Sequence, residues 1–192
     1  MEPLYNSPKL LLSFGIFSGL ITVIQIVCIF LPYWMHIDST RWIGVFHSIN
    51  ENGDKFVETG CTDSMGELEC SYLKSFQISA VVSVMFGGVT TLLYFFSPNY
   101  LNDMISFFAI TGTLIQASFG LITFVLFYYF EQSYFDDDGI NQEYPGVGAD
   151  ETNLAVGWYL WLSFNSVSWI MVFAGYFLIY KGGSQKKGVL RM

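Results

Sequence analysis

Charged side chains are scarce in this sequence of 192 residues, and four long stretches have none. Only 12% of the residues are Asp, Glu, Lys or Arg, whereas a soluble domain carries about a quarter. The charge-free stretches lie between Lys9 and Asp38, Lys74 and Asp103, Asp103 and Glu131, and Glu151 and Lys181, and they are 28, 28, 27 and 29 residues long. A helix needs about 20 apolar residues to cross the hydrocarbon core of a bilayer, so each stretch accommodates one membrane span and none accommodates two.

Residues that perform chemistry are also few. The chain has only two histidines and three cysteines, and it contains no tight metal-ligand spacing, glycine-rich phosphate loop or nucleophile elbow. We therefore expect neither enzymatic activity nor a cofactor. His36 and His47 leave one alternative open, because with a nearby acid they could bind zinc. The net charge of −8 gives no support to nucleic acid as a partner.

What is present is a set of four apolar segments, which predict an all-α membrane protein. The first apolar run, Leu10 to Leu31, is longer than the roughly 7 to 15 residues of a signal-peptide core and ends without a small-residue cleavage site, so we expect it to remain as a span. Ser97-Pro98-Asn99 should end the second helix, because proline cannot continue helical hydrogen bonding. The predicted order is an N-terminus at 1–9, a helix at 10–32, an outer loop at 33–74, a helix at 75–96, a turn at 97–103, a helix at 104–130, an outer loop at 131–154, a helix at 155–180 and a tail at 181–192.

The distribution of charge predicts which loops lie outside the cell. One side of the predicted membrane has five basic residues against two acidic ones, and the other side has three against 14. Because basic residues near span ends accumulate in the cytoplasm, both termini and the turn at 97–103 should be cytoplasmic, and the two acidic loops should be extracellular. The basic tail should lie near the anionic lipid of the inner leaflet, which makes membrane lipid an expected partner.

Small residues at helical spacing indicate where the spans pack. Gly15 and Gly19 in the first span are four residues apart, and Gly112, Gln116 and Gly120 follow one stripe of the third. We expect both sets to pack inside the protein's own helix bundle, with Gln116 hydrogen-bonded there. Two alternatives remain open, namely a dimer interface at Gly15 and Gly19 and a transport path at Gln116.

The first outer loop is about 40 residues long, so it should have structure of its own. Residues 42–46 and 55–59 are rich in β-branched and aromatic residues, and Asn52-Gly53 between them favours a tight turn, so they predict an antiparallel hairpin. A third strand should follow at 69–73. Cys61 and Cys70 belong to the same loop, and in an oxidising compartment we expect them to form a disulfide.

The second outer loop contains three consecutive aspartates, Asp136, Asp137 and Asp138. They suggest calcium, but an EF-hand loop needs alternating ligands and a glutamate at its twelfth position, where this sequence has Val147. We expect a solvated acidic turn. An acidic surface that concentrates cations or repels the surface of a neighbouring cell is the other alternative.

Several stretches together resemble the claudin-like tetraspan superfamily, in particular the divergent claudins of arthropods. They are Pro32-Tyr33-Trp34 at the end of the first span, Gly44-Val45-Phe46 where claudins have Gly-Leu-Trp, the cysteine pair with eight residues between its members, and Gly157-Trp158 at the start of the last span. Two positions depart from the claudin pattern. Phe46 replaces the motif tryptophan, and the first cysteine stands at Cys61 where the claudin spacing expects it at Ile49. Pro32-Tyr33-Trp34 and Gly44-Val45-Phe46-His47 are about equally similar to the lipoma-fusion-partner-like tetraspans, whose members act as accessory subunits of channels and receptors.

The resemblance implies a left-handed four-helix transmembrane bundle with a small extracellular antiparallel β-sheet, made of four strands from the first loop and one from the second. It implies a structural protein of the plasma membrane at lateral cell-cell junctions. Such a protein binds itself or other tetraspan junction proteins in the same and opposing membranes and restricts paracellular flow, as in a septate junction. An auxiliary subunit of a channel or receptor is the alternative. A channel or transporter in its own right is disfavoured, because the spans lack the charged groups that usually mark ion paths.

Overall fold

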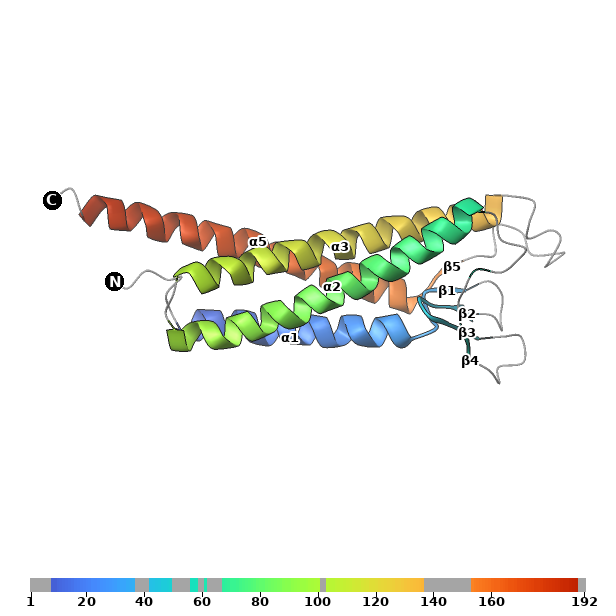
Figure 1. The fold of residues 1–192 in the computed structure, drawn as a ribbon, viewed down its shortest axis with the longest axis horizontal. Helices are drawn as coiled ribbons and strands as arrows, with labels where there is room; N and C mark the ends of the chain where they lie inside the picture. Colours follow the sequence, from blue (N-terminus) through green and yellow to red (C-terminus); the bar gives the residue numbers. More distant parts are fainter. Residues whose placement is uncertain are drawn as a thin grey trace. The chain divides into compact units, whose positions relative to one another are not determined.

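In the computed structural model, residues 8–36, 42–49, 56–58, 61, 67–100, 103–136 and 153–189 are described. These residues form four long helices and five short strands (Figure 1). The helices are α1 (Pro8–Phe30), α2 (Glu67–Tyr100), α3 (Asp103–Asp136) and α5 (Val156–Val189). The strands are β1 (Met35–His36), β2 (Trp42–Ile43), β3 (His47–Ile49), β4 (Phe56–Glu58) and β5 (Asn153–Leu154).

All four helices are long and apolar enough to cross a membrane. The prediction of an all-α protein with four apolar helices is therefore confirmed. The candidate spans within the helices are Lys9–Phe30, Cys70–Phe96, Met104–Glu131 and Val156–Phe177.

Three helices extend well beyond the predicted helix bounds. α2 begins at Glu67 instead of residue 75, α3 ends at Asp136 instead of residue 130, and α5 ends at Val189 instead of residue 180. A charge-free stretch marks the length of apolar sequence, whereas a helix continues for as long as its own backbone hydrogen bonds form. The predicted strand at 69–73 is wrong, because those residues belong to the extended start of α2.

The two prolines near helix ends act differently. α1 ends at Phe30, before Pro32, as the bias against helical geometry ahead of a proline favours. α2 instead continues through Pro98 to Tyr100, so the predicted stop at residues 97–99 is placed slightly too early. Proline removes one hydrogen bond to the carbonyl four residues earlier, and in the last turn of a helix few further bonds depend on it.

The five strands form one sheet in which every neighbouring pair is antiparallel. Its order is β4-β3-β2-β1-β5, so four strands come from the chain between α1 and α2, and the fifth immediately precedes α5. The strands lie side by side next to the end of α1 (Figure 1). In the register of β1, Met35 is opposite both Ile43 of β2 and Leu154 of β5.

The predicted hairpin has a different pairing. β2 pairs with β3, and β3 pairs with β4, so β3 lies between the two strands that were predicted to pair with each other. The chain turns at Gly44, whose N–H donates a hydrogen bond to the His47 carbonyl oxygen at 2.9 Å, and β2 ends there. The predicted tight turn at residues 52–53 lies outside the described residues.

The chain forms two compact units. Unit 1 comprises Met1–Val23, Ser83–Ser118 and Phe164–Met192, and unit 2 comprises Ile24–Val82 and Phe119–Ser163. Unit 2 contains the sheet. The core of unit 1 is built by buried apolar side chains from all four helices, which are Leu11, Ile21, Tyr94, Ala109, Ile110 and Met171.

Glycines bring α1 and α2 close together in unit 1. A Cβ atom on Gly15 would lie 3.2 Å from the Cβ of Tyr94, and one on Gly19 would lie 3.2 Å from the methyl carbon of Thr91. These distances are at the lower limit of ordinary side-chain contacts. Gly15 and Gly19 therefore pack against a helix of their own chain.

The stripe on α3 makes similar contacts. A Cβ atom on Gly112 would lie 2.5 Å from the Thr90 hydroxyl oxygen. Gln116 is buried, and its backbone carbonyl accepts a hydrogen bond from the Ser83 hydroxyl at 2.9 Å. These contacts join α2 to α3 within unit 1.

Many polar side chains of unit 1 are buried, and many large apolar side chains outside its core are exposed. Ile16, Met85 and Phe173 are 56%, 64% and 68% exposed. This is the reverse of a soluble protein, and it suits helices surrounded by lipid, where a polar side chain is costly unless it faces protein. The buried polar residues are Ser18, Thr22, Ser83, Thr90, Ser106, Thr113, Gln116, Asn165 and Ser168.

Gly87 and Gly88 provide a matched test of packing in unit 1. A Cβ atom on Gly87 would lie 2.5 Å from Thr22 Oγ1 and 2.7 Å from Gln116 Nε2, whereas one on Gly88 would have nothing within 4 Å. We predict that Gly87→Ala destabilises the detergent-solubilised protein by about 1–3 kcal/mol. Gly88→Ala should be neutral or slightly stabilising, because alanine favours helix. Thermal unfolding followed by circular dichroism measures both, and equal effects would contradict the described packing.

Candidate functional site

Trp34 connects the end of α1 to the sheet. Its side chain is completely buried, and its indole N–H donates a hydrogen bond to the Cys28 carbonyl oxygen at 2.7 Å. That carbonyl belongs to the last turn of α1, where carbonyls have no partner within the helix. The Trp34 backbone N–H donates to the Ile43 carbonyl at 3.0 Å, and the Trp34 carbonyl accepts from the Ala155 N–H at 2.9 Å. One residue therefore ties α1, β2 and the chain entering α5 together.

Two glycines allow other parts of the chain to approach Trp34. A Cβ atom on Gly44 would lie 2.7 Å from the Cα of Pro32, and one on Gly157 would lie 2.7 Å from the Tyr33 carbonyl oxygen. The Gly157 N–H donates a hydrogen bond to that same carbonyl at 2.7 Å. Any larger residue at either position would collide with backbone. We call this group of residues the Trp34 junction, and it consists of Pro32, Tyr33, Trp34, Gly44, Val45, Ala155 and Gly157.

The Trp34 ring lies in a cluster of buried aromatic side chains. Its centroid is 5.2 Å from that of Phe127, in an edge-to-face arrangement, and 5.4 Å from that of Trp161. Phe76 continues the cluster, with centroids 5.3 Å from Phe127 and 5.8 Å from Phe130. Such aromatic pairs contribute about 0.5–1.5 kcal/mol each beyond the burial of their area. The cluster joins α2, α3 and α5 to the segment from which the sheet begins.

Two residues that the sequence singled out lie beside this cluster. The Gly120 carbonyl accepts a hydrogen bond from the Trp161 indole N–H at 2.9 Å. Trp158 is buried, and its ring centroid is 4.4 Å from that of Phe124. Unlike the other two indoles, the Trp158 N–H has no hydrogen-bond partner among the residues that the structure describes.

The turn at Gly44-Val45-Phe46 is anchored to α2 by a residue that the sequence reasoning missed. Val45 is completely buried, and its carbonyl accepts a hydrogen bond from Gln77 Nε2 at 2.8 Å. Phe46, which stands in place of the claudin tryptophan, is half-buried. The sequence shows only that Gln77 is a glutamine near the start of an apolar segment. That position does not indicate which carbonyl its amide contacts.

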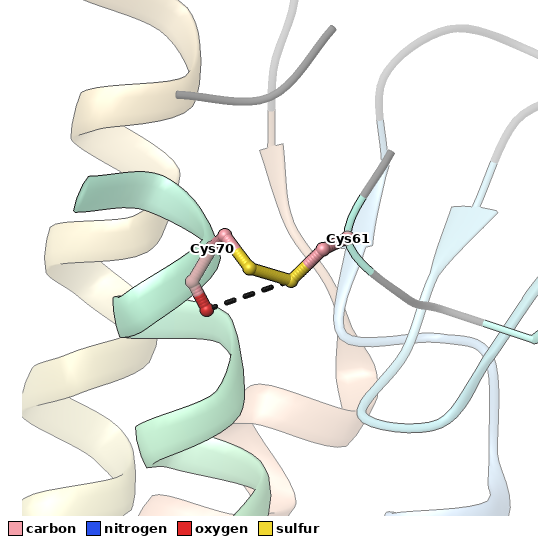
Figure 2. The surroundings of a disulfide bond; sticks show 2 residues. All are labelled: Cys61 and Cys70. Carbon is pink, nitrogen blue, oxygen red and sulfur yellow. Dashed lines mark hydrogen bonds between the residues drawn. A yellow bond between two sulfur atoms is a disulfide. The ribbon is translucent and has the colours of Figure 1, made fainter. Parts of the chain in front are cut away.

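Cys61 and Cys70 form a disulfide, as predicted, with their Cα atoms 5.3 Å apart (Figure 2). Cys70 lies in the first turn of α2, and Cys61 lies in the chain that leads from β4 to that helix. The Cys61 sulfur is also 3.7 Å from the Cys70 carbonyl oxygen. Oxidised sulfur has no proton to donate, so this second contact is packing. The third cysteine, Cys28, is a buried free thiol.

The acidic patch and the metal alternatives receive no further support. The described residues contain no group of three or more His, Cys, Asp and Glu side chains that could hold a metal ion. Asp136 is the last residue of α3, whereas Asp137 and Asp138 lie outside the described residues. The solvated acidic turn therefore stays a prediction.

Trp34 and Trp158 are matched for a test of the junction. Trp34→Phe keeps an aromatic ring but leaves the buried Cys28 carbonyl without its donor, whereas Trp158→Phe removes an N–H that has no partner among the described residues. We predict that Trp34→Phe destabilises the protein by about 1–3 kcal/mol more than Trp158→Phe does. Thermal unfolding in detergent measures the difference. A larger loss from Trp158→Phe would show that the Trp34 hydrogen bond is not what holds the junction.

The disulfide is tested by removing either of its cysteines. Cys61→Ser or Cys70→Ser frees the connection between β4 and α2, and the loss of a disulfide costs about 2–4 kcal/mol. We predict that both variants are retained in the secretory pathway, as measured by surface biotinylation. Cys28→Ala, which leaves the disulfide intact, is the control and should reach the surface. Alkylation of Cys61 and Cys70 in non-reduced wild-type protein would contradict the bond.

Comparison with known proteins does not add a relative. No protein-family model matches this sequence, and no curated protein matches it either. The likeness to claudin-like tetraspans is therefore a resemblance carried by the residues named above, and any function has to be argued from them and their contacts.

Proposed function

We propose that the protein is a structural cell-junction protein of the claudin type, which contributes to cell-cell contact and to a paracellular barrier like that of septate or tight junctions. The observation that carries the proposal is the Trp34 junction. The stretches that resemble the claudin superfamily are far apart in the sequence, and three of them meet there, namely Pro32-Tyr33-Trp34, Gly44-Val45 and Gly157. If these stretches are motifs of one family, we expect them to come together at one place in the fold.

The Trp34 junction supports a role in recognition because it fixes the sheet. Trp34 is hydrogen-bonded through its backbone on both sides and through its side chain. The disulfide between Cys61 and Cys70 restrains the connection from β4 to α2. A surface held in one conformation loses little conformational entropy when a partner binds. The proposed partners are further copies of this protein, or other tetraspan junction proteins, in the same and opposing membranes.

The proposed orientation puts the sheet outside the cell and both termini in the cytoplasm. The side that carries the sheet has three basic residues against five on the opposite side, and the side with more Lys and Arg is expected to be cytoplasmic. The disulfide supports the same orientation, because such bonds persist in oxidising compartments. The proposed location is the lateral plasma membrane.

The finer fold assignment belongs to the same proposal. It is a left-handed four-helix bundle that carries a claudin-like extracellular sheet. Four strands between α1 and α2 and one strand before α5 support it, since the resemblance implies that division. Phe46 in place of tryptophan is a departure from the claudin pattern.

The polar contacts within unit 1 favour a structural role over transport. The Ser18 and Thr91 hydroxyls are 3.0 Å apart, and the Tyr94 and Thr113 hydroxyls are 3.1 Å apart, each pair joining two helices. These groups are uncharged, and they are used for packing. An ion or proton path usually depends on charged side chains inside the membrane, and the charge-free stretches supply none.

Localisation and dye exclusion test the proposal together. We predict that the tagged protein concentrates at lateral contacts of a polarised epithelium and that its depletion lets a tracer dye pass between the cells. Wild-type protein and Gly88→Ala should restore the barrier. Gly157→Leu should not, because its side chain would collide with Tyr33 and Trp34.

Two results would contradict the barrier role. One is an even distribution over the cell surface, and the other is continued dye exclusion after depletion. Co-purification with a stoichiometric channel or receptor would then favour an auxiliary subunit.

A further inference from the structure

Trp158 lies where α5 enters its apolar span. The candidate span begins at Val156, so Trp158 lies about 3 Å beyond its start along the helix axis. The residues Asn153–Leu154 just before it form β5, so the helix itself begins at this point. Tryptophan and tyrosine are enriched at this depth of a bilayer, where the acyl chains meet the headgroups. In a spanning α5, Trp158 therefore lies at the boundary between acyl chains and headgroups.

The indole N–H of Trp158 is a buried donor without an acceptor. Only 8% of the residue is exposed, and none of the described residues accepts a hydrogen bond from its N–H. The indoles of Trp34 and Trp161 donate to backbone carbonyls instead. A buried tryptophan N–H usually has a partner, because an unpaired buried donor loses the hydrogen bonds that it makes in water. An acceptor supplied from outside the protein would satisfy this donor.

The surroundings of Trp158 are apolar and aromatic, and they come from α3 and α5 of unit 2. Its ring packs against Phe124 of α3, with centroids 4.4 Å apart, and meets the exposed Tyr159 edge-to-face at 5.1 Å. Leu121 and Tyr128 lie about one turn to either side of Phe124 on α3, and both are exposed. We call these five residues the Trp158 surface.

The helices of the Trp158 surface favour a neutral acceptor. α3 contains no Lys or Arg, and neither do residues 156–163 of α5. Anionic phosphate is usually bound by such cationic side chains, so it is a poor match for this surface. A phospholipid also carries neutral acceptors, which are the carbonyls of its two ester bonds, and these lie at the boundary between headgroups and acyl chains. Depth and charge therefore select the same group.

We propose that the Trp158 surface binds a phospholipid, with one of its ester carbonyls accepting the hydrogen bond of the Trp158 indole. An acyl chain then lies along Leu121, which is one turn deeper in the membrane than Phe124. The N–H is covered in the structure, and the exposed Tyr159 side chain admits the carbonyl by changing rotamer, which takes nanoseconds or less. This inference needs α5 to span a membrane, and it is independent of the junction role.

A comparison of ester and ether lipids tests the inference on the full-length protein. The protein is reconstituted with equal amounts of a diester phosphatidylcholine and the diether phosphatidylcholine with the same chains, which lacks the carbonyls. The complex that retains one lipid in mild detergent is then analysed by native mass spectrometry. One hydrogen bond predicts that the wild type retains the diester lipid about 2–10-fold over the diether lipid. Trp158→Phe keeps an aromatic ring without the N–H and should retain both lipids equally.

Two controls separate the Trp158 N–H from other causes. Trp161→Phe removes an indole N–H that already donates to the Gly120 carbonyl, so it should leave the preference for the diester lipid unchanged. Tyr159→Phe keeps the ring beside Trp158 and removes only the hydroxyl, so the preference should persist. Thermal unfolding establishes that each variant is folded at the temperature of the lipid measurement.

Three outcomes would overturn the inference. The first is equal retention of the two lipids by the wild type, and the second is the same preference in the wild type and in Trp158→Phe. The third is displacement of the phospholipid by an equal amount of a sterol in the wild type but not in Trp158→Phe, which would assign the N–H to a sterol hydroxyl. Dye exclusion has no part in this experiment, so its result can be told apart from a failure of the proposed barrier role.

Discussion

The burial of Trp34 is the constraint on which the arrangement of the sheet in unit 2 depends. A tryptophan removed from water needs apolar surroundings for its ring and partners for its N–H and its backbone. Phe127 and Trp161 surround the ring, and the last turn of α1 accepts the indole proton. Its backbone bonds then determine where β2 and the start of α5 lie. The two glycines of the junction are needed because the chain passes too close for a side chain.

The helices of unit 1 are held by a different principle. Association of helices in lipid gains little from the hydrophobic effect, since the surrounding acyl chains are as apolar as the side chains. Close approach and uncharged hydrogen bonds therefore have to supply the attraction. Gly15, Gly87 and Gly112 allow the approach, and hydroxyl groups such as those of Tyr94 and Thr113 provide the bonds. As a result the helices pack tightly, and no charged side chain is buried among the described residues of unit 1.

Under the proposed topology, the side of the membrane that carries the sheet is also the acidic side of the chain, with 14 acidic residues in its sequence. The sheet is held by the hydrogen bonds of Trp34 and by the disulfide, and that arrangement suits contact with other proteins.

The number of apolar helices and the disulfide could be determined from the sequence by itself. The length of a charge-free stretch is a local property, and Cys61 and Cys70 are only nine positions apart in the sequence. The resemblance also singled out Trp34, Gly44 and Gly157, although nothing in their spacing indicates that they touch. Only the tertiary structure decided that β4 pairs with β3, that residues 69–73 are helical, and that Gly87 packs while Gly88 does not. Those outcomes depend on partners far away in the sequence, and two adjacent glycines are locally identical until another helix lies against one of them.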